Sequence, residues 1–131
     1  MIVRRERPGD RAAARAVQAA AFPTEVEADL LDELRADDGW LDDLSLVAEV
    51  EGEVVGHVVC TRGTIGADHR PALGLGPIAV DPARQGAGIG SALVHAVVAV
   101  AEARGEALVA LLGDPAFYGR LGFEPASVHG V

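Results

Sequence analysis

The sequence predicts a mixed α/β domain with the element order β-α-α-β-β-β-α-β-α-β. Two strand-like segments joined by Glu51-Gly52 predict an antiparallel hairpin. Strands alternate with helices in the second half of the chain, which implies parallel pairing around a long helix. The 131 residues suit one domain with one core, so we expect residues 1–131 to fold as a single unit.

The first half of the chain supplies a strand, two helices and the hairpin. Asp10 is placed to cap the first helix, which Pro23 ends. Thr24-Glu25-Val26-Glu27 has the pattern of a capping box, so we expect it to start the second helix. The expected ranges are 2–5, 44–50 and 54–60 for strands, and 10–22 and 24–39 for helices.

The second half begins with a segment, 63–72, that carries Gly, Asp, His and Pro and is expected to be a loop. Gly74, Gly76 and Pro77 inside the next strand predict a bulge or an edge without a ladder bond. Gly105 is a natural C-terminal cap for the long helix. The expected elements are strands at 73–80, 107–112 and from about 123, a long helix at 91–104 and a short helix at 114–121.

Composition excludes several classes of protein. Half of the residues are hydrophobic, which excludes a disordered chain. The single cysteine, Cys60, excludes a disulfide framework and a multi-cysteine zinc site, and no metal site is expected. The N-terminus reaches charge and proline before any apolar stretch, and the longest apolar run, 92–101, is too short to cross a bilayer. We therefore expect a cytoplasmic protein with no membrane partner.

The net charge of −9 argues against nucleic acid as a partner, because that binding depends on basic side chains. The acidity is regional. Residues 24–53 contain 12 acidic residues and one arginine (−11), which leaves 8 acidic and 10 basic residues elsewhere (+2). Either this region is a solvated helix face, or it is a surface that attracts a cationic partner.

The segment with the most specific chemistry is Gln85-Gly86-Ala87-Gly88-Ile89-Gly90, which joins a strand to the long helix. Glycines permit positive φ and let a ligand approach the backbone. Free N–H groups at the start of a helix, together with its dipole, form an anion site, and phosphate is the expected anion. A P-loop is excluded because the chain has no lysine. The spacing and the late position also differ from the dinucleotide-binding G-x-G-x-x-G.

The turn resembles the acyl-CoA-binding turn of the GNAT acetyltransferase superfamily, whose pattern is Gln/Arg-x-x-Gly-x-Gly/Ala, and residues 85–90 fit every defined position. Val80-Asp81-Pro82 matches the end of that superfamily's fourth strand. Residues 112–123 look like a second signature of its small YhbS-like branch, whose form Tyr-x-x-x-Gly-Phe is filled from Tyr118 to Phe123. The element order also agrees, so the resemblance covers nearly the whole chain.

The resemblance implies a GNAT-like mixed sheet whose fourth and fifth strands splay apart, with acetyl-CoA as the cosubstrate. The pantetheine of acetyl-CoA would pair with the main chain of the fourth strand. Its diphosphate would lie on the N–H groups of the glycine turn, with Arg84 as a salt-bridge donor. The cofactor-binding residues implied are Ile78, Ala79, Val80, Arg84, Gln85, Gly86, Ala87, Gly88, Ile89, Gly90 and Ser91.

By the same resemblance Tyr118 is the general acid that protonates the departing CoA thiolate; the alternative is an aromatic packing residue. The general base stays open, because the fourth strand carries no acid. His57, Glu49 or a chain of water molecules are the alternatives, although a buried, hydrogen-bonded role is the simpler one for His57. Cys60 is most simply a small core residue, and Asp114 a helix cap.

The implied function is N-acetyltransfer from acetyl-CoA to an amine, and the acidic region favours a cationic small molecule or a protein amine as the acceptor. A noncatalytic acyl-CoA-binding module and a plain structural interaction domain are the alternatives. GNAT proteins usually add one more strand after the one near Phe123, for which the remaining eight residues are too few. The final strand is therefore expected to be missing or to come from a partner subunit, and an open edge would favour a homodimer.

Overall fold

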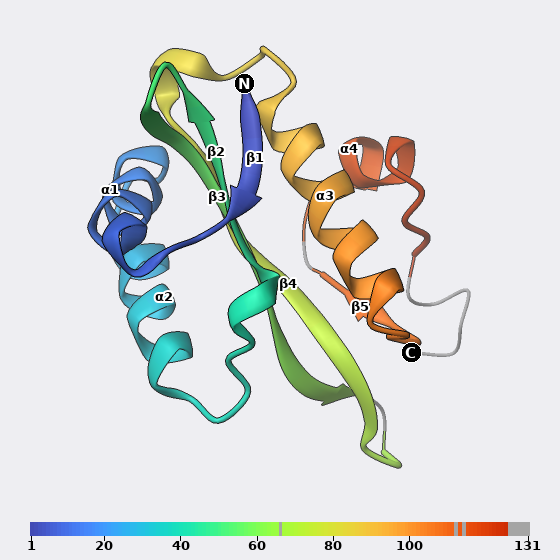
Figure 1. Ribbon diagram of the computed structural model, residues 1–131. Coiled ribbons are helices and arrows are strands. Elements are labelled where there is room, and N and C mark those ends of the chain that lie inside the picture. Colours follow the sequence, from blue (N-terminus) through green and yellow to red (C-terminus); the bar gives the residue numbers. More distant parts are fainter. Residues whose placement is uncertain (66, 112, 114, 126–131) are drawn as a thin grey trace.

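A computed structural model describes residues 1–65, 67–111, 113 and 115–125 (Figure 1). Its five strands form one sheet in the order β1-β2-β3-β4-β5. Neighbours from β1 to β4 are antiparallel, and β5 lies parallel to β4. The strands are β1 (Ile2–Arg5), β2 (Ser45–Val50), β3 (Glu53–Ile65), β4 (Arg70–Val80) and β5 (Val109–Ala110).

Helices cover both faces of the sheet, with α1 and α2 on one face and α3 and α4 on the other (Figure 1). The helices are α1 (Arg11–Ala21), α2 (Val26–Ala36), α3 (Ile89–Ala103) and α4 (Pro115–Arg120). Short 3-10 turns at Pro8–Asp10, Asp42–Leu44 and Pro82–Arg84 lead into α1, into β2 and out of β4.

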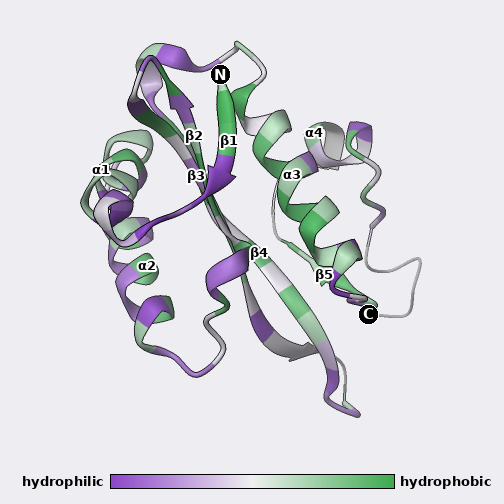
Figure 2. Cartoon of the chain, viewed as in Figure 1, coloured by the Kyte–Doolittle hydropathy of each residue, from purple (hydrophilic) through white to green (hydrophobic). Residues whose placement is uncertain are grey.

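Buried side chains lie on both faces of the sheet, so helices pack against both faces. Leu46 and Ala48 of β2 belong to a buried cluster with Leu93 and Val97 of α3. Val47 between them is also fully buried, and because successive strand residues alternate, it faces the layer of α1 and α2. Figure 2 shows α3 as largely hydrophobic and α2 as mixed, in keeping with the deeper burial of α3.

The loop expected at 63–72 is wrong. β3 runs to Ile65 and β4 starts at Arg70, and the two strands stay paired up to that point. His69 in the connecting turn adopts a positive φ of 52°. The polar and glycine-rich sequence does not prevent pairing, because ladder hydrogen bonds join main-chain groups whatever the side chains are.

The predicted bulge in β4 is confirmed. Val58 pairs with Ile78 and Cys60 with Leu75, so two residues of β4, Gly76 and Pro77, lie opposite a single residue of β3. Gly76 has φ +133°, which glycine tolerates. The missing N–H of the proline falls where the ladder is already interrupted.

Helix termini follow the predictions only in part. Asp10 precedes α1, but its carboxylate accepts a hydrogen bond from the N–H of Arg7 (2.8 Å) and does not cap α1. The capping box at Thr24 is wrong: α2 begins at Val26, whose N–H reaches the Thr24 hydroxyl at 3.4 Å. Gly105 follows α3 with φ +78°, as predicted for a C-terminal cap.

The predicted splay of β4 and β5 is confirmed. Leu73 pairs with Val109 and Gly74 with Ala110, and β5 then ends, two residues long where six were expected. β4 continues to Val80 with no strand along that edge among the described residues. Residues 123–125 are not in a strand, and the rest of the predicted last strand, residues 126–131, lies outside the described residues.

Candidate active site

A pocket of about 220 Å³ opens where the free edge of β4 meets the start of α3. The ends of α1 and α4 complete its walls. Six of the residues predicted from the sequence meet here, and Ala21, Phe22 and Phe117 join them. The lining residues are Ala21, Phe22, Ile78, Ala79, Val80, Gln85, Gly90, Phe117 and Tyr118.

The glycine turn beside the pocket has the geometry of an anion cradle. Gly86 and Gly88 have φ values of +85° and +82°, and a Cβ built on either would meet no atom within 4 Å. The space beside the turn is therefore open. Ala92 donates to the carbonyl of Gly88 (3.0 Å), so the main-chain N–H groups just before it lack an acceptor within the helix.

Side chains around the turn hold it against β4. Asp81 accepts a hydrogen bond from the N–H of Ala83 (3.0 Å), which closes the 3-10 turn. Gln85 Nε2 donates to the carbonyl of Val80 (3.2 Å), so one of the main-chain acceptors predicted to bind pantetheine is already engaged. Arg84 is half-buried in the 3-10 turn, next to Gln85. Ile89 is 5 % exposed, so only its N–H is placed to serve the cradle.

Tyr118 packs as an aromatic residue and also lines the pocket. Its ring lies edge-on to Phe117 (centroids 5.0 Å apart) and Phe123 (5.8 Å). A Cβ on Gly113 would collide with this ring, 2.8 Å from Cδ2, so glycine is required there. Burial raises the pKa of the Tyr118 phenol, which keeps it protonated at neutral pH, as a general acid must be. Its catalytic role stays a prediction.

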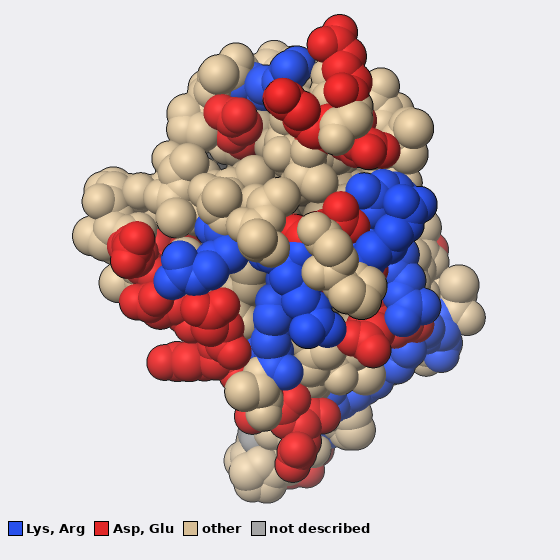
Figure 3. Space-filling model, turned by 60° about the vertical axis from the view of Figure 1, so that its left-hand side comes forward, with Lys and Arg blue, Asp and Glu red and all other residues tan. Residues whose placement is uncertain are grey.

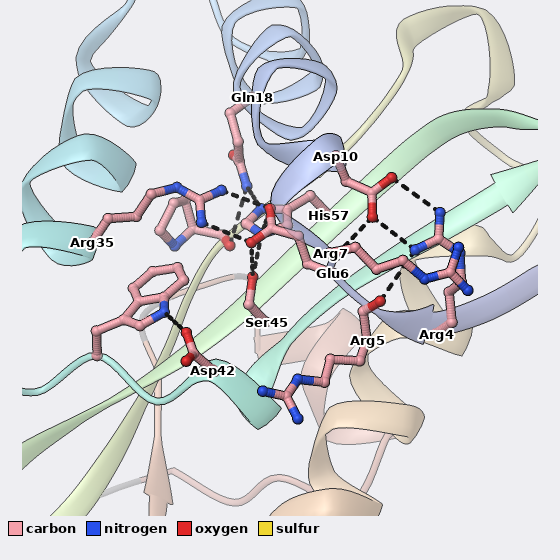
Figure 4. Close-up of polar contacts among 12 residues, drawn as sticks. Arg4, Arg5, Glu6, Arg7, Asp10, Gln18, Arg35, Asp42, Ser45 and His57 are labelled. Atoms are coloured by element: carbon pink, nitrogen blue, oxygen red, sulfur yellow. Dashed lines mark hydrogen bonds and ion pairs between the residues drawn. The ribbon is translucent and has the colours of Figure 1, made fainter.

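His57 is a buried, hydrogen-bonded residue and does not line the pocket. Gln18 Nε2 donates to His57 Nδ1 (3.0 Å) and to the carbonyl of Pro77 (3.3 Å). The proton of His57 therefore resides on Nε2, which donates to the Ser45 hydroxyl (2.9 Å). Ser45 in turn donates to Glu6 (3.1 Å). Figure 4 shows this chain of side chains running from α1 to the end of β1.

The pKa of His57 predicts how stability depends on pH. Burial lowers this pKa from 6.5 to about 4, so the unfolded chain binds a proton that the folded protein does not. The free energy of unfolding should therefore fall by about 2 kcal/mol between pH 7 and pH 5. Urea denaturation at both pH values measures this difference. Glu6 and Asp10, whose pKa values are lowered by their folded environment, add their effects only below this range.

Two variants isolate the contribution of His57. His57→Asn should remove most of the pH-dependent loss, whereas His69→Asn, at the exposed tip of the β3–β4 hairpin, should retain it. An equal loss in the wild-type protein and in His57→Asn would contradict this assignment.

Cys60 and Glu49 also lie away from the pocket. Cys60 is completely buried, and burial raises the pKa of its thiol to about 12, so it is inert. Glu49 forms an ion pair with Arg4 (3.5 Å). Asp114 and its expected helix cap lie outside the described residues. No acidic side chain lines the pocket within the part of the chain that is described.

The acidic region is partly paired with arginine. Asp29 and Asp32 bind Arg15 at 2.8 and 2.9 Å, and Asp43 binds Arg104 at 2.7 Å. None of these acids lines the pocket. Their contacts are those of a solvated, ion-paired surface, and any attraction of a cationic partner acts outside the pocket.

Sequence reasoning missed the walls that α1 and the segment after it contribute, Ala21 and Phe22. It also missed the buried network around His57. Gln18 offered a signal, because it interrupts the apolar face that Ala14 and Val17 form on α1, and all three are buried.

Residues 42–125 match the family model of the acetyltransferase (GNAT) domain, well over half of the chain. The chain belongs to the GNAT acetyltransferase family. This GNAT protein is 37% identical over 130 residues to the uncharacterized N-acetyltransferase YhbS of Escherichia coli K12. The match covers 98% of this chain and 77% of YhbS.

Solved structures agree with this placement. A GNAT family acetyltransferase from Brucella melitensis, in complex with acetyl-CoA, has 40% identity and a TM-score of 0.86, over 95% of this chain and 82% of that one. The structure of YhbS from Escherichia coli, in complex with CoA, has 34% identity and a TM-score of 0.89. The match covers 98% of this chain and 71% of that one. The predicted fold and the YhbS-like branch of the GNAT family are confirmed.

The predicted enzyme class, an acyl-CoA-dependent N-acetyltransferase, is confirmed as well by the family match and the named relatives. Among the described residues of this GNAT protein, no helix is long and apolar enough to cross a membrane. The same residues contain no group of three or more His, Cys, Asp or Glu side chains that could hold a metal ion.

Proposed function

We propose that the protein transfers the acetyl group of acetyl-CoA to an amine in the pocket between β4, α3 and α4. One observation carries the proposal: the unpaired edge of β4, the open glycine turn and Tyr118 meet at this pocket. Acetyl-CoA is the cosubstrate of this family, and the two similar structures contain acetyl-CoA and CoA.

The protein would contribute to the reaction mainly by positioning acetyl-CoA against the acceptor. The main-chain groups that face the unpaired edge of β4 between Ile78 and Val80 would pair with the pantetheine, as an added strand does. The N–H groups from Gly86 to Ser91 would hold the diphosphate, with Arg84 beside them. These contacts would hold the thioester in line with the acceptor nitrogen. Such alignment lowers the activation free energy by several kcal/mol, about 7 or more when it is ideal.

Two protons must move during the transfer. The amine nitrogen bonds to the thioester carbon, the carbon–sulfur bond breaks, and the departing thiolate takes the phenolic proton of Tyr118. The reacting nitrogen of the acceptor has to be neutral when it attacks. Phe22, Ala79 and Phe117 make much of the wall apolar, and such surroundings lower the pKa of a bound amine and favour its neutral form. The amide nitrogen then gives its extra proton to water, and a proton from solvent restores the Tyr118 phenol.

As the acceptor we propose a cationic amine. Residues 24–53 carry a net charge of −11 and include α2, which follows directly on the pocket wall at Phe22. Figure 3 shows carboxylates at the left edge of the face that α1 and α2 present, with further groups above and below. This field would raise the local concentration of a polyamine, an aminoglycoside-like amine or a basic peptide.

An acceptor panel tests this choice. Cationic amines should turn over with kcat/KM at least about tenfold above matched neutral amines, and the advantage should shrink at 0.5 M salt because exposed charges are screened. Thiol release measures the rates. Turnover with neutral or anionic acceptors alone would contradict the cationic acceptor and leave N-acetyltransfer intact.

The sequence alone also allowed a noncatalytic acyl-CoA-binding module, and measuring acetyl-CoA binding together with thiol release distinguishes such a module from the enzyme. Acetyl-CoA at 100 times its Kd should stabilise the fold by about 2.7 kcal/mol and raise Tm by several degrees. Thiol release on adding an amine then identifies an enzyme. Stabilisation without thiol release would favour the binding module, and no stabilisation would contradict both.

The remaining expectations from the sequence stay predictions. These are a cytoplasmic location, a homodimer, and one domain spanning residues 1–131.

A further inference from the structure

A second depression, of about 130 Å³, opens where β1 passes into α1. It shares no lining residue with the pocket at β4. Arg11 begins α1 and borders the depression, whereas Ala21 ends α1 and borders the pocket, so the two sites lie roughly 15 Å apart along the helix. The lining residues are Arg5, Glu6, Arg7, Pro8, Arg11 and Asp42.

Three arginines at this depression lack an ion-pair partner. Arg5, Arg7 and Arg11 have no carboxylate oxygen within 4 Å in the described ranges, although the chain has 20 acidic residues for 11 arginines. All three are exposed. Six other arginines do have such a partner: Arg4, Arg15, Arg35, Arg62, Arg70 and Arg104.

The carboxylates nearby are already engaged. Glu6 receives two hydrogen bonds from Arg35, at 2.7 and 2.6 Å, and one from Ser45. Asp10 is held by Arg4 at 2.7 and 3.0 Å. The charge of Glu6 is thus balanced by Arg35, and Asp10 shares Arg4 with Glu49.

Asp42 accepts a hydrogen bond from the indole of Trp40 (2.8 Å), which is neutral. It is therefore the one lining carboxylate left to balance three guanidinium groups, and the depression carries a net positive charge. This contrasts with the net charge of −9 on the chain as a whole. Figure 3 shows arginine side chains gathered at the centre and right of the face that α1 and α2 present.

The backbone that carries the arginines is fixed. Arg5 pairs with Leu46 in the β1–β2 ladder, and Arg7 donates its N–H to Asp10 (2.8 Å), which closes the 3-10 turn before Arg11. Figure 4 shows Arg5 and Arg7 leaving the chain in different directions, so they border the depression from two sides. The backbone entropy of this segment is already lost when the protein folds. A ligand would therefore have to order only the long arginine side chains.

We propose that this depression binds a compact, multivalent oxyanion of the phosphate class. Guanidinium groups offer planar pairs of N–H donors that match the oxygens of phosphate, and three of them suit a ligand with at least two negative charges. The ligand is compact because Asp42 lies in the wall and Asp37 and Asp38 lie in the adjoining segment. These carboxylates repel an extended polyanion such as a nucleic acid. The site is independent of acetyl transfer.

Calorimetric titration of the full chain with pyrophosphate, and with inorganic phosphate, tests the site at low salt. One equivalent should bind saturably at the depression, and the double substitution Arg7→Gln and Arg11→Gln should weaken binding there at least tenfold. Arg70→Gln, which removes one arginine at the distant β3–β4 hairpin, is the matched control and should leave binding unchanged. Circular dichroism and Tm check that each variant folds.

The glycine turn at α3 is a second place where pyrophosphate could bind, and Gly88→Val separates the two. Retained binding in Gly88→Val, with loss in the double variant, supports the depression. Loss in Gly88→Val with retention in the double variant assigns the anion to the glycine turn and overturns the proposal. Absence of saturable binding overturns it too, as does a single-stranded oligonucleotide that binds as tightly as pyrophosphate.

Discussion

Replacing Tyr118 with phenylalanine should lower kcat about 100-fold or more, because the general acid supplies that much of the rate in comparable proton transfers. The phenol lines the pocket, and within the described residues its hydroxyl has no hydrogen-bond partner, so it is available to a leaving thiolate. Burial raises its pKa and keeps the proton in place before the transfer. Steady-state thiol release at saturating acetyl-CoA measures the change.

The affinity for CoA should stay nearly the same in this variant. Phenylalanine keeps the edge-on contacts of the ring with Phe117 and Phe123 and removes only the oxygen. Phe123→Leu is the complementary variant: it disturbs the packing and keeps the hydroxyl, so it should lower Tm more than it lowers kcat. A wild-type kcat in Tyr118→Phe would remove the phenol from the mechanism and leave Tyr118 with its packing role alone.

The features that the sequence predicted correctly depend on single residues or on short stretches of neighbouring residues. The bulge at Gly76-Pro77 and the turn around Gly88 follow from the backbone preferences of single residues, which hold wherever the segment lies in the fold. The lack of a lysine excluded a P-loop without any knowledge of the structure. The order of the elements followed from hydrophobic spacing.

What the sequence did not predict depends on contacts between distant segments. The β3–β4 hairpin extends through a stretch with loop-like composition because each strand completes the other's main-chain hydrogen bonds. The network of Glu6, Ser45 and His57 joins residues up to about fifty positions apart, and no local pattern connects them. Phe22 likewise reaches the pocket only because α1 packs against the sheet.

Replacing Gly88 with valine should weaken CoA binding at least about 100-fold, because two or more charge-assisted hydrogen bonds to phosphate, each worth about 1.5–3 kcal/mol, would be lost. Gly88 has φ +82°, a conformation that a β-branched residue adopts only with strain. A Cβ at this position meets no protein atom within 4 Å, so the side chain projects into the open space beside the N–H groups of the turn. Calorimetric titration with CoA measures the loss.

Gly105→Val is the matched control for the backbone strain. Gly105 has nearly the same φ, +78°, and the same free space, but it lies at the opposite end of α3. Both variants should lose similar stability, by about 1–2 kcal/mol, since each forces valine into the left-handed region. Only Gly88→Val should lose CoA. If it kept tight CoA binding, the diphosphate would have to lie elsewhere; if both variants lost CoA equally, strain transmitted through α3 would explain the effect better than a blocked cradle.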